Sequence, residues 1–362
     1  MANPSRSALI FEILESRPSC TTAELMTGLE KASGAKQSQI TLTRELKVLI
    51  ESGQVLRDGK GRAIRYSLSP TANLLRSIDV DKYFERSPDE RPCFERYNLD
   101  ILDQLGQISV FDDKELKLLS AYHKEFQAQK KALSPTLVKK EFERFTIELS
   151  WKSSVIEGNT YSLLETETLL KEGIAAKGKK AEDARMLLNH KTALGFVQEH
   201  AADFFPLNLR YIEKTHSLLV KGLGVSDRLR KTLVSITGTR YRPLDNEFQV
   251  REALEGACRH INRQKDCFSR SLLAILLISY IQPFEDGNKR TSRIIGNALL
   301  LNKNSFPLSF RSVDATDYKK AILLFYERNN ITAFKEIFIE QAEFSVKNYY
   351  RSTASNINER KK

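Results

Sequence analysis

The stretch IQPFEDGNKRTSR, residues 281–293, gathers acidic, glycine and basic residues between two apolar segments. Gly287 can adopt backbone conformations that other residues avoid. If a helix begins there, its first N–H groups and its dipole form an anion site. Arg290 and Arg293, three residues apart, can face one side and grip phosphate oxygens in bidentate fashion. The pattern indicates a phosphate-binding loop, and a capped helix start with a surface salt bridge is the simpler alternative.

Three more loop residues suit a bound nucleotide. Asp286 offers a hard carboxylate for a Mg²⁺ ion that bridges phosphates. Asn288 lies near the expected helix start. Lys289 has two interpretations, because its cation could bind phosphates or its bulk could crowd them. We favour the binding interpretation.

The segments around the loop must position these side chains. Residues 272–278 are apolar on every side, which is typical of a helix buried in the middle of a bundle. Residues 294–300 resume helical spacing after the loop. We therefore expect the loop at a helix N-terminus, surrounded by packed helices.

The loop resembles the signature of the Fic family, His-x-Phe-x-Asp/Glu-Gly-Asn-Gly-Arg-x-x-Arg. Members of this family mostly transfer AMP from ATP to a hydroxyl of a target protein. Gln282 stands at the position of the family histidine, and Lys289 at that of a glycine; the Asn-Lys-Arg run is closer to the Doc branch, which transfers phosphate. The matching residues are Phe284, Asp286, Gly287, Asn288, Arg290 and Arg293, with Pro283 as often found.

The resemblance implies ATP and Mg²⁺ as ligands and a Ser, Thr or Tyr hydroxyl of a target protein as acceptor. Asp286 would hold the metal. The nucleotide would contact Gly287, Asn288, Lys289, Arg290 and Arg293, and the catalytic positions would be Gln282, Asn288 and Arg290.

A second segment, SSVIEGN at residues 153–159, resembles the inhibitory segment of Fic proteins. By itself it could be a helix stop, with Gly158 as the C-cap. The resemblance implies that Ser153, Glu157 and Gly158 form an inhibitory element in which Glu157 pairs with Arg293. That arginine could then not hold the γ-phosphate.

Gln282 leaves the mechanism open. In the family the histidine acts as general base, and an amide cannot titrate in that way. Loss of a general base typically lowers the rate by about 10²- to 10⁴-fold. The substitutes considered are His190, His200, His216 and His260, each of which also has a structural interpretation. Two hypotheses remain: an auto-inhibited transferase that is weakened by Gln282 and coupled to DNA binding, and a catalytically silent nucleotide sensor that acts as a DNA-binding regulator.

A third part of the resemblance is a β-hairpin flap that presents the target by strand addition. Residues 236–248 interrupt the helical pattern and could form it. The target-binding residues would be Thr237, Gly238, Thr239 and Tyr241.

The N-terminal residues have a different pattern. Helical spacing covers residues 6–17, 22–30 and 37–52, and a basic hairpin turns at residues 58–61. Three helices and a hairpin are typical of a winged helix-turn-helix that binds DNA, and protein docking is the alternative. The candidate DNA contacts are Lys36, Gln37, Thr41 and Arg44 on or beside the third helix, and Arg57, Lys60, Arg62 and Arg65 on the hairpin.

Composition sets wider limits. The 362 residues are 41% hydrophobic and 28% charged, with a net charge of +11, which favours a globular protein with an acidic partner. The longest apolar run is too short to cross a bilayer, and the start of the chain lacks a signal-peptide pattern. Four cysteines without a CxxC pair predict reduced thiols, so we expect a cytoplasmic protein with no membrane partner.

The predicted fold is mainly α: a Fic-fold helical bundle with a β-hairpin flap, preceded by a winged helix-turn-helix. The oligomeric state stays open, with a homodimer as one alternative. The predicted parts are the winged helix-turn-helix domain 1–70, a helical connector 71–110, the Fic domain 111–345 and a basic tail 346–362.

Overall fold

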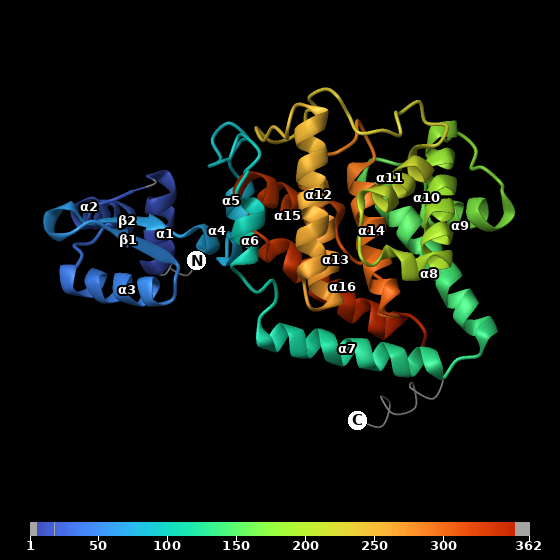
Figure 1. Ribbon diagram of the computed structural model, residues 1–362, viewed down its shortest axis with the longest axis horizontal. Coiled ribbons are helices and arrows are strands. Elements are labelled where there is room, and N and C mark those ends of the chain that lie inside the picture. Colours follow the sequence, from blue (N-terminus) through green and yellow to red (C-terminus); the bar gives the residue numbers. More distant parts are fainter. Residues whose placement is uncertain (1–5, 18, 352–362) are drawn as a thin grey trace.

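The computed structural model describes residues 6–17 and 19–351, apart from the side chain of Arg62. A small N-terminal unit lies at one end of the molecule and a larger bundle of helices makes up the rest (Figure 1). Within the described ranges, no helix is long and apolar enough to cross a membrane.

Three helices and a hairpin make up the N-terminal unit. A capping box between Thr21 and Glu24 starts the second helix, and Gly34, in the left-handed conformation, ends it. The strands are antiparallel, with Val55 opposite Leu68. The elements are α1 (Arg6–Ser16), α2 (Thr22–Ser33), α3 (Gln39–Glu51), β1 (Val55–Asp58) and β2 (Arg65–Leu68). Their apolar faces form a separate small core, so this unit packs around its own centre.

The connector is packed against the bundle, as its aromatic content predicts. Tyr83 and Tyr97 are half-buried against the main core. Arg91 forms a buried ion pair with Glu327 at 2.8 Å. The connector helices are α4 (Pro70–Leu75), α5 (Val80–Phe84) and α6 (Ile101–Gly106).

Ten longer helices form the described part of the bundle. Every residue of α13 is buried, which matches its uniformly apolar sequence. Gly296 lets α14 approach α13, because an added Cβ would lie 2.5 Å from Ile275 Cγ1. The helices are α7 (Asp113–Lys131), α8 (Pro135–Ile156), α9 (Leu163–Glu172), α10 (Ala181–Glu199), α11 (Leu209–Val220), α12 (Glu247–Arg263), α13 (Cys267–Ile281), α14 (Asn288–Asn302), α15 (Ala315–Arg328) and α16 (Thr332–Asn348).

The expected β-hairpin at residues 236–248 is not present. This segment contains no strand, and its one β-bridge joins Arg242 to Arg96 of the connector in parallel. Pro243 removes a backbone donor next to that bridge. The side chain of Tyr241 is buried and donates a hydrogen bond to the carbonyl of Tyr280 at 2.9 Å. Core and connector contacts therefore take the place of pairing within the segment.

The C-terminal boundary also differs from the prediction. Helix α16 continues to Asn348, and Tyr349 and Tyr350 are buried against the bundle. The ordered bundle thus extends past residue 346, the predicted start of the basic tail. Residues 352–362 of that tail lie outside the described residues.

Candidate functional site

The loop between α13 and α14 has left-handed backbone conformations at both ends. Gln282 caps α13 with φ 50° and ψ 60°, and Gly287 precedes α14 with φ 81°. A Cβ on Gly287 would lie 3.2 Å from Val220 Cγ1 and 3.3 Å from His216 Nε2. The glycine is therefore required for both conformation and space.

Asn288 holds the loop in shape. Its Nδ2 donates to the carbonyl of Phe284 at 2.8 Å, and its Oδ1 accepts from the N–H of Phe284 at 2.8 Å. The same Nδ2 donates to Oε1 of Gln282 at 2.9 Å. Asn288, predicted as a catalytic and nucleotide-binding residue, has its side-chain hydrogen bonds directed to the loop itself.

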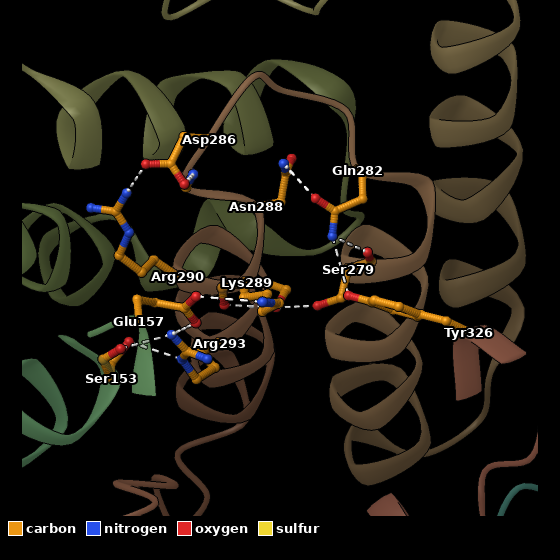
Figure 2. Close-up of polar contacts among 12 residues, drawn as sticks. Ser153, Glu157, Ser279, Gln282, Asp286, Asn288, Lys289, Arg290, Arg293 and Tyr326 are labelled. Atoms are coloured by element: carbon orange, nitrogen blue, oxygen red, sulfur yellow. Dashed lines mark hydrogen bonds and ion pairs between the residues drawn. The ribbon is translucent and has the colours of Figure 1, made fainter. Parts of the chain in front are cut away.

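The side-chain amide of Gln282 is engaged at both ends (Figure 2). Its Nε2 donates to the carbonyl of Ser279 at 2.6 Å and to the hydroxyl of Tyr326 at 3.1 Å, while its Oε1 accepts from Asn288. The residue is buried. These contacts fix the amide in one orientation, and an amide does not ionise near neutral pH, so it cannot act as a general base.

Asp286 neutralises part of the loop's positive charge. Its Oδ2 pairs with Arg290 Nη2 at 2.9 Å, and its Oδ1 accepts from the N–H of Gly287 at 2.6 Å. The carboxylate is 66% exposed at the edge of the site. Among the described residues, no group of three potential metal ligands occurs. One accessible carboxylate fits Mg²⁺ that arrives with nucleotide phosphates, since that ion uses one or two carboxylates and completes its shell with phosphates and water.

Arg290 has hydrogen-bonding capacity to spare. It is 1% exposed, and its Nε and Nη1 are buried without a partner among the described residues. Burial lowers the pKa of Arg290 from its usual value, while Asp286 and Glu157 act in the opposite direction. Buried donors without partners are unfavourable, so this guanidinium fits an anion that enters from the cavity.

Arg293 is fully buried, and its Nε and Nη2 have partners, whereas its Nη1 has none among the described residues. Its Nη2 donates to Oε1 of Glu157 at 2.8 Å and to the carbonyl of Ser153 at 2.9 Å, and its Nε donates to Oγ of Ser153 at 2.8 Å. Burial raises the pKa of Glu157, but Arg293 and then Lys289 pull it down, and the net pKa lies below its usual value. Glu157 is therefore ionised at neutral pH and occupies the arginine. Gly158, the third predicted inhibitory residue, follows with φ 96° and lines the cavity.

The candidate histidines lie away from the cavity. His190 is fully buried, with Nε2 3.0 Å from Oγ of Ser153, and burial holds its pKa well below the usual value. The ring of His216 stacks on Phe284 with centroids 3.6 Å apart, behind the loop. His200 and His260, on or next to α10 and α12, do not line the cavity either.

Sequence reasoning missed the residues that support the loop from outside it. Arg230 is buried. Its side-chain Nε donates to the carbonyl of Gln282, and its backbone N–H donates to the carbonyl of Pro283. His216 Nε2 donates to the carbonyl of Asp286, 2.9 Å away. No local pattern marks these residues, because they reach the loop from segments 52 and 70 positions earlier.

The loop opens into a cavity of 430 Å³. Its walls come from the end of α8, residues 234–237, the loop and α15. Thr237 lines it, whereas Gly238, Thr239 and Tyr241, the other predicted flap residues, do not. The carbonyl of Gly238 accepts from Arg91 of the connector. A larger, open hollow of 1260 Å³ between α7, α8 and α10 contains none of the predicted site residues.

The predicted DNA contacts on and beside α3 are mostly accessible. Lys36, Thr41 and Arg44 are exposed. Gln37 is tied down, because Arg6 Nε donates to its Oε1 at 3.0 Å. The helix face with Thr41 thus has free polar groups, whereas Gln37 belongs to the turn before it.

The hairpin residues are similar. Arg57 and Lys60 are exposed, and Arg65 is exposed with its Nη1 3.5 Å from the carbonyl of Ser19. The side chain of Arg62 lies outside the described residues. The structure therefore places three basic side chains on the outer surface of this hairpin.

Fold and site together define a helical protein with a glycine-containing loop and several cationic side chains at the N-terminus of α14. Residues 206–300, which include the loop, match the sequence model of the Fic/DOC family. The chain therefore contains a Fic/DOC family domain.

Known proteins show the same relationship. The chain is 24% identical over 260 residues to protein adenylyltransferase fic-1 of Caenorhabditis elegans, covering 67% of this chain and 48% of that protein. It is 27% identical over 184 residues to protein adenylyltransferase Fic of Nematostella vectensis, covering 46% and 40%. The solved structure of a Fic-1 fragment from C. elegans is similar with a TM-score of 0.57 and 17% identity, covering 95% of this chain and 96% of that chain. The mainly helical fold is thus a Fic fold, and the match spans about half the length of these curated relatives or less.

Proposed function

We propose that this chain is an auto-inhibited Fic-type transferase that binds ATP with Mg²⁺ and transfers AMP slowly to a hydroxyl of a target protein. One observation carries the proposal: Arg290 lines the cavity and has two buried nitrogens without a partner among the described residues, while Glu157, which also lines the cavity, already pairs with Arg293 behind it. The cavity is lined by three cations, Arg290, Lys289 and Lys319, and by the carboxylates of Glu157, Glu285 and Asp286, which suits a polyanion that arrives with a divalent cation. The names of the relatives supply the reaction class.

The phosphates would lie at the N-terminus of α14. Its first N–H groups and the helix dipole favour negative charge, and Gly287 and Asn288 line the cavity at this point. Arg290 would donate its free N–H groups to phosphate oxygens. Mg²⁺ bound to the phosphates would be held by Asp286, and it neutralises charge that develops on the phosphates during transfer.

Glu157 would inhibit by occupying Arg293. Its carboxylate contributes negative charge where the terminal phosphate of ATP would need positive charge. Productive binding therefore requires Glu157 to leave Arg293. The inhibitory role of Ser153 would be indirect, since it holds the other side of the same guanidinium.

Gln282 would limit the chemical step. Its Nε2 already makes two hydrogen bonds, but its Oε1 accepts only from Asn288 in the described structure and could accept a second hydrogen bond from an incoming Ser, Thr or Tyr hydroxyl. Without a general base, catalysis would depend on positioning and on phosphate stabilisation by Arg290 and the loop. We expect a rate lower by about 10²- to 10⁴-fold than with a histidine there.

Gln282 cannot act as a general base, which favours a second candidate, a silent nucleotide sensor that regulates through DNA. The N-terminal unit would be its winged helix-turn-helix, with α3 in the major groove and Arg57, Lys60 and Arg65 near phosphates. An ion pair between Glu15 of α1 and Arg328 of α15, at 3.1 Å, supports a connection between that unit and the site. Ile40, 68% exposed on α3, suits a protein-docking surface instead.

Labelled ATP separates the candidates. The wild-type protein, Glu157→Gly and the double variant Glu157→Gly/Gln282→His are incubated with radiolabelled ATP, Mg²⁺ and a lysate of target proteins. Label transfer by Glu157→Gly supports the transferase. Transfer only after Gln282→His supports the sensor, and absence of ATP binding by all three in calorimetry contradicts both.

A further inference from the structure

The two carboxylate oxygens of Glu157 face different cations (Figure 2). Oε1 accepts from Arg293 at 2.8 Å, and Oε2 lies 3.6 Å from Nζ of Lys289. The Arg293 side chain is 0% exposed, whereas that of Lys289 is 26% exposed at the edge of the cavity. One partner is thus fixed in the core and the other is accessible.

We propose that Lys289 is a second, exchangeable restraint on Glu157: it holds the carboxylate in the resting site and transfers its charge to the phosphates when a nucleotide enters. This inference rests on the proposed function, because it assumes a nucleotide in the cavity. It gives Lys289 a regulatory role that a phosphate contact alone would not have.

The surroundings of the three loop cations explain why Lys289 is the one that can move. Arg293 is held by two contacts to Ser153 and lies over the ring of Tyr318, 5.2 Å from its centroid. Arg290 is buried and paired with Asp286. Lys289 has a flexible stem, a partly exposed ammonium and a longer ion-pair distance, so it can turn with little loss of packing.

The exchange has a consequence for affinity. A phosphate that draws Lys289 away leaves Glu157 with Arg293 alone, which weakens the inhibitory contact as the nucleotide binds. Conversely, removing Lys289 deprives the nucleotide of a cation and also loosens Glu157. These two effects on affinity have opposite signs, and only a comparison in two backgrounds separates them.

Calorimetric titration with ATP and Mg²⁺ of four proteins makes that comparison: wild type, Lys289→Met, Glu157→Gln and the double variant. In the Glu157→Gln background, loss of a charged phosphate contact should weaken binding about 10-fold. With Glu157 present, the same substitution should weaken binding less, by a factor of about 2 to 5, because it also releases the inhibitor. Equal losses in both backgrounds overturn the inference and leave Lys289 as a phosphate contact only.

Lys319→Met is the matched control. Lys319 lines the same cavity, and its charge is not paired with Glu157 in the structure. Its substitution should change the ATP dissociation constant by the same factor in both backgrounds. A background-dependent change for this variant as well would attribute the effect to general cavity charge and overturn the specific role of Lys289.

A nucleotide-free measurement separates failure of this inference from failure of the proposed function. In ¹³C-glutamate-labelled protein, the signal lost in Glu157→Gln identifies the Glu157 carboxyl, whose titration is followed by NMR. Lys289→Met should move that titration to higher pH, because a stabilising cation is removed. An unchanged titration overturns the restraint. If no variant binds ATP, the proposed function and the exchange step fall, and the titration still decides the restraint.

Discussion

The segment 282–293, which comprises the loop and the first turns of α14, and the N-terminal hairpin both carry several basic residues, but these residues differ in burial and pairing. In this segment Arg290 and Arg293 are buried, and Glu157 forms ion pairs with both Arg293 and Lys289. On the hairpin, Arg57 and Lys60 point to solvent. Buried charges need a fixed counter-charge and hence a defined geometry, whereas exposed charges need neither. The basic residues of segment 282–293 therefore have a fixed geometry that suits a specific site, whereas those of the hairpin form a surface whose partner must be found by experiment.

Replacement of a buried arginine of α14 should have the largest effect on stability. Arg293→Met leaves Glu157 in the site without its main partner, so the free energy of unfolding should fall by about 3 to 5 kcal/mol. Chemical denaturation measures this. The matched surface variant Arg57→Met should change stability by less than about 0.5 kcal/mol. Similar effects for both arginines would contradict the distinction between buried and exposed charge.

Two glycines, Gly287 in the site and Gly53 in the N-terminal unit, allow a second comparison of the two regions. Gly287→Ala should destabilise by about 2 to 3 kcal/mol, because it combines left-handed strain with the contacts to Val220 and His216. Gly53 in the N-terminal unit also has a positive φ, 70°, but nothing lies within 4 Å of an added Cβ. Gly53→Ala should therefore cost only the strain, about 1 to 2 kcal/mol. Thermal unfolding of the two variants ranks them, and the reverse order would show that the space at Gly287 is not limiting.

The ionised carboxylate of Glu157 should make the stability of the protein depend on pH. The folded-state pKa of Glu157 is lowered, so its stabilising contribution is present above its unfolded pKa of about 4.3 and is lost as pH falls through the folded value. The stability difference between wild type and Glu157→Gln should shrink as pH falls from 6 to 3. Urea unfolding at several pH values measures it, with Glu51→Gln, on the exposed end of α3, as control. A difference that is constant over this range would contradict ionisation of Glu157 in the site.

The smallest expected effect concerns the hairpin. If Arg57 and Lys60 contact DNA phosphates, each substitution by Met should reduce the salt dependence of binding by about one unit in the log–log slope. Band-shift titrations at several salt concentrations measure this slope. Binding that does not depend on salt, or on these residues, would favour the docking alternative for the N-terminal unit.

Much of the fold could be predicted from periodicity. The three N-terminal helices and the hairpin occur where apolar spacing placed them, and α13 is buried as its uniformly apolar sequence indicates. The segment at residues 236–248 could not be predicted, because burial of Tyr241 and the bridge to Arg96 are long-range contacts that override local turn signals.

The site divides in the same way. Glu157 pairs with Arg293, a contact that the two motifs predicted. Lys289 also lies near Glu157, because residues 289 and 293 share one face of α14. The contribution of Arg230 and the double engagement of the Gln282 amide could not be read from the loop, since Arg230 and Tyr326 come from other elements. Local sequence specified the chemistry of the loop, and distant segments set its orientation.

A crystal structure of Glu157→Gly soaked with ATP and Mg²⁺ tests the central claim most directly. We expect phosphates at the N-terminus of α14, in contact with Nε or Nη1 of Arg290, the terminal phosphate at Arg293, and Mg²⁺ at Asp286. Density for the nucleotide elsewhere, or a cavity in which Arg290 keeps its free N–H groups at saturating ATP, would contradict it.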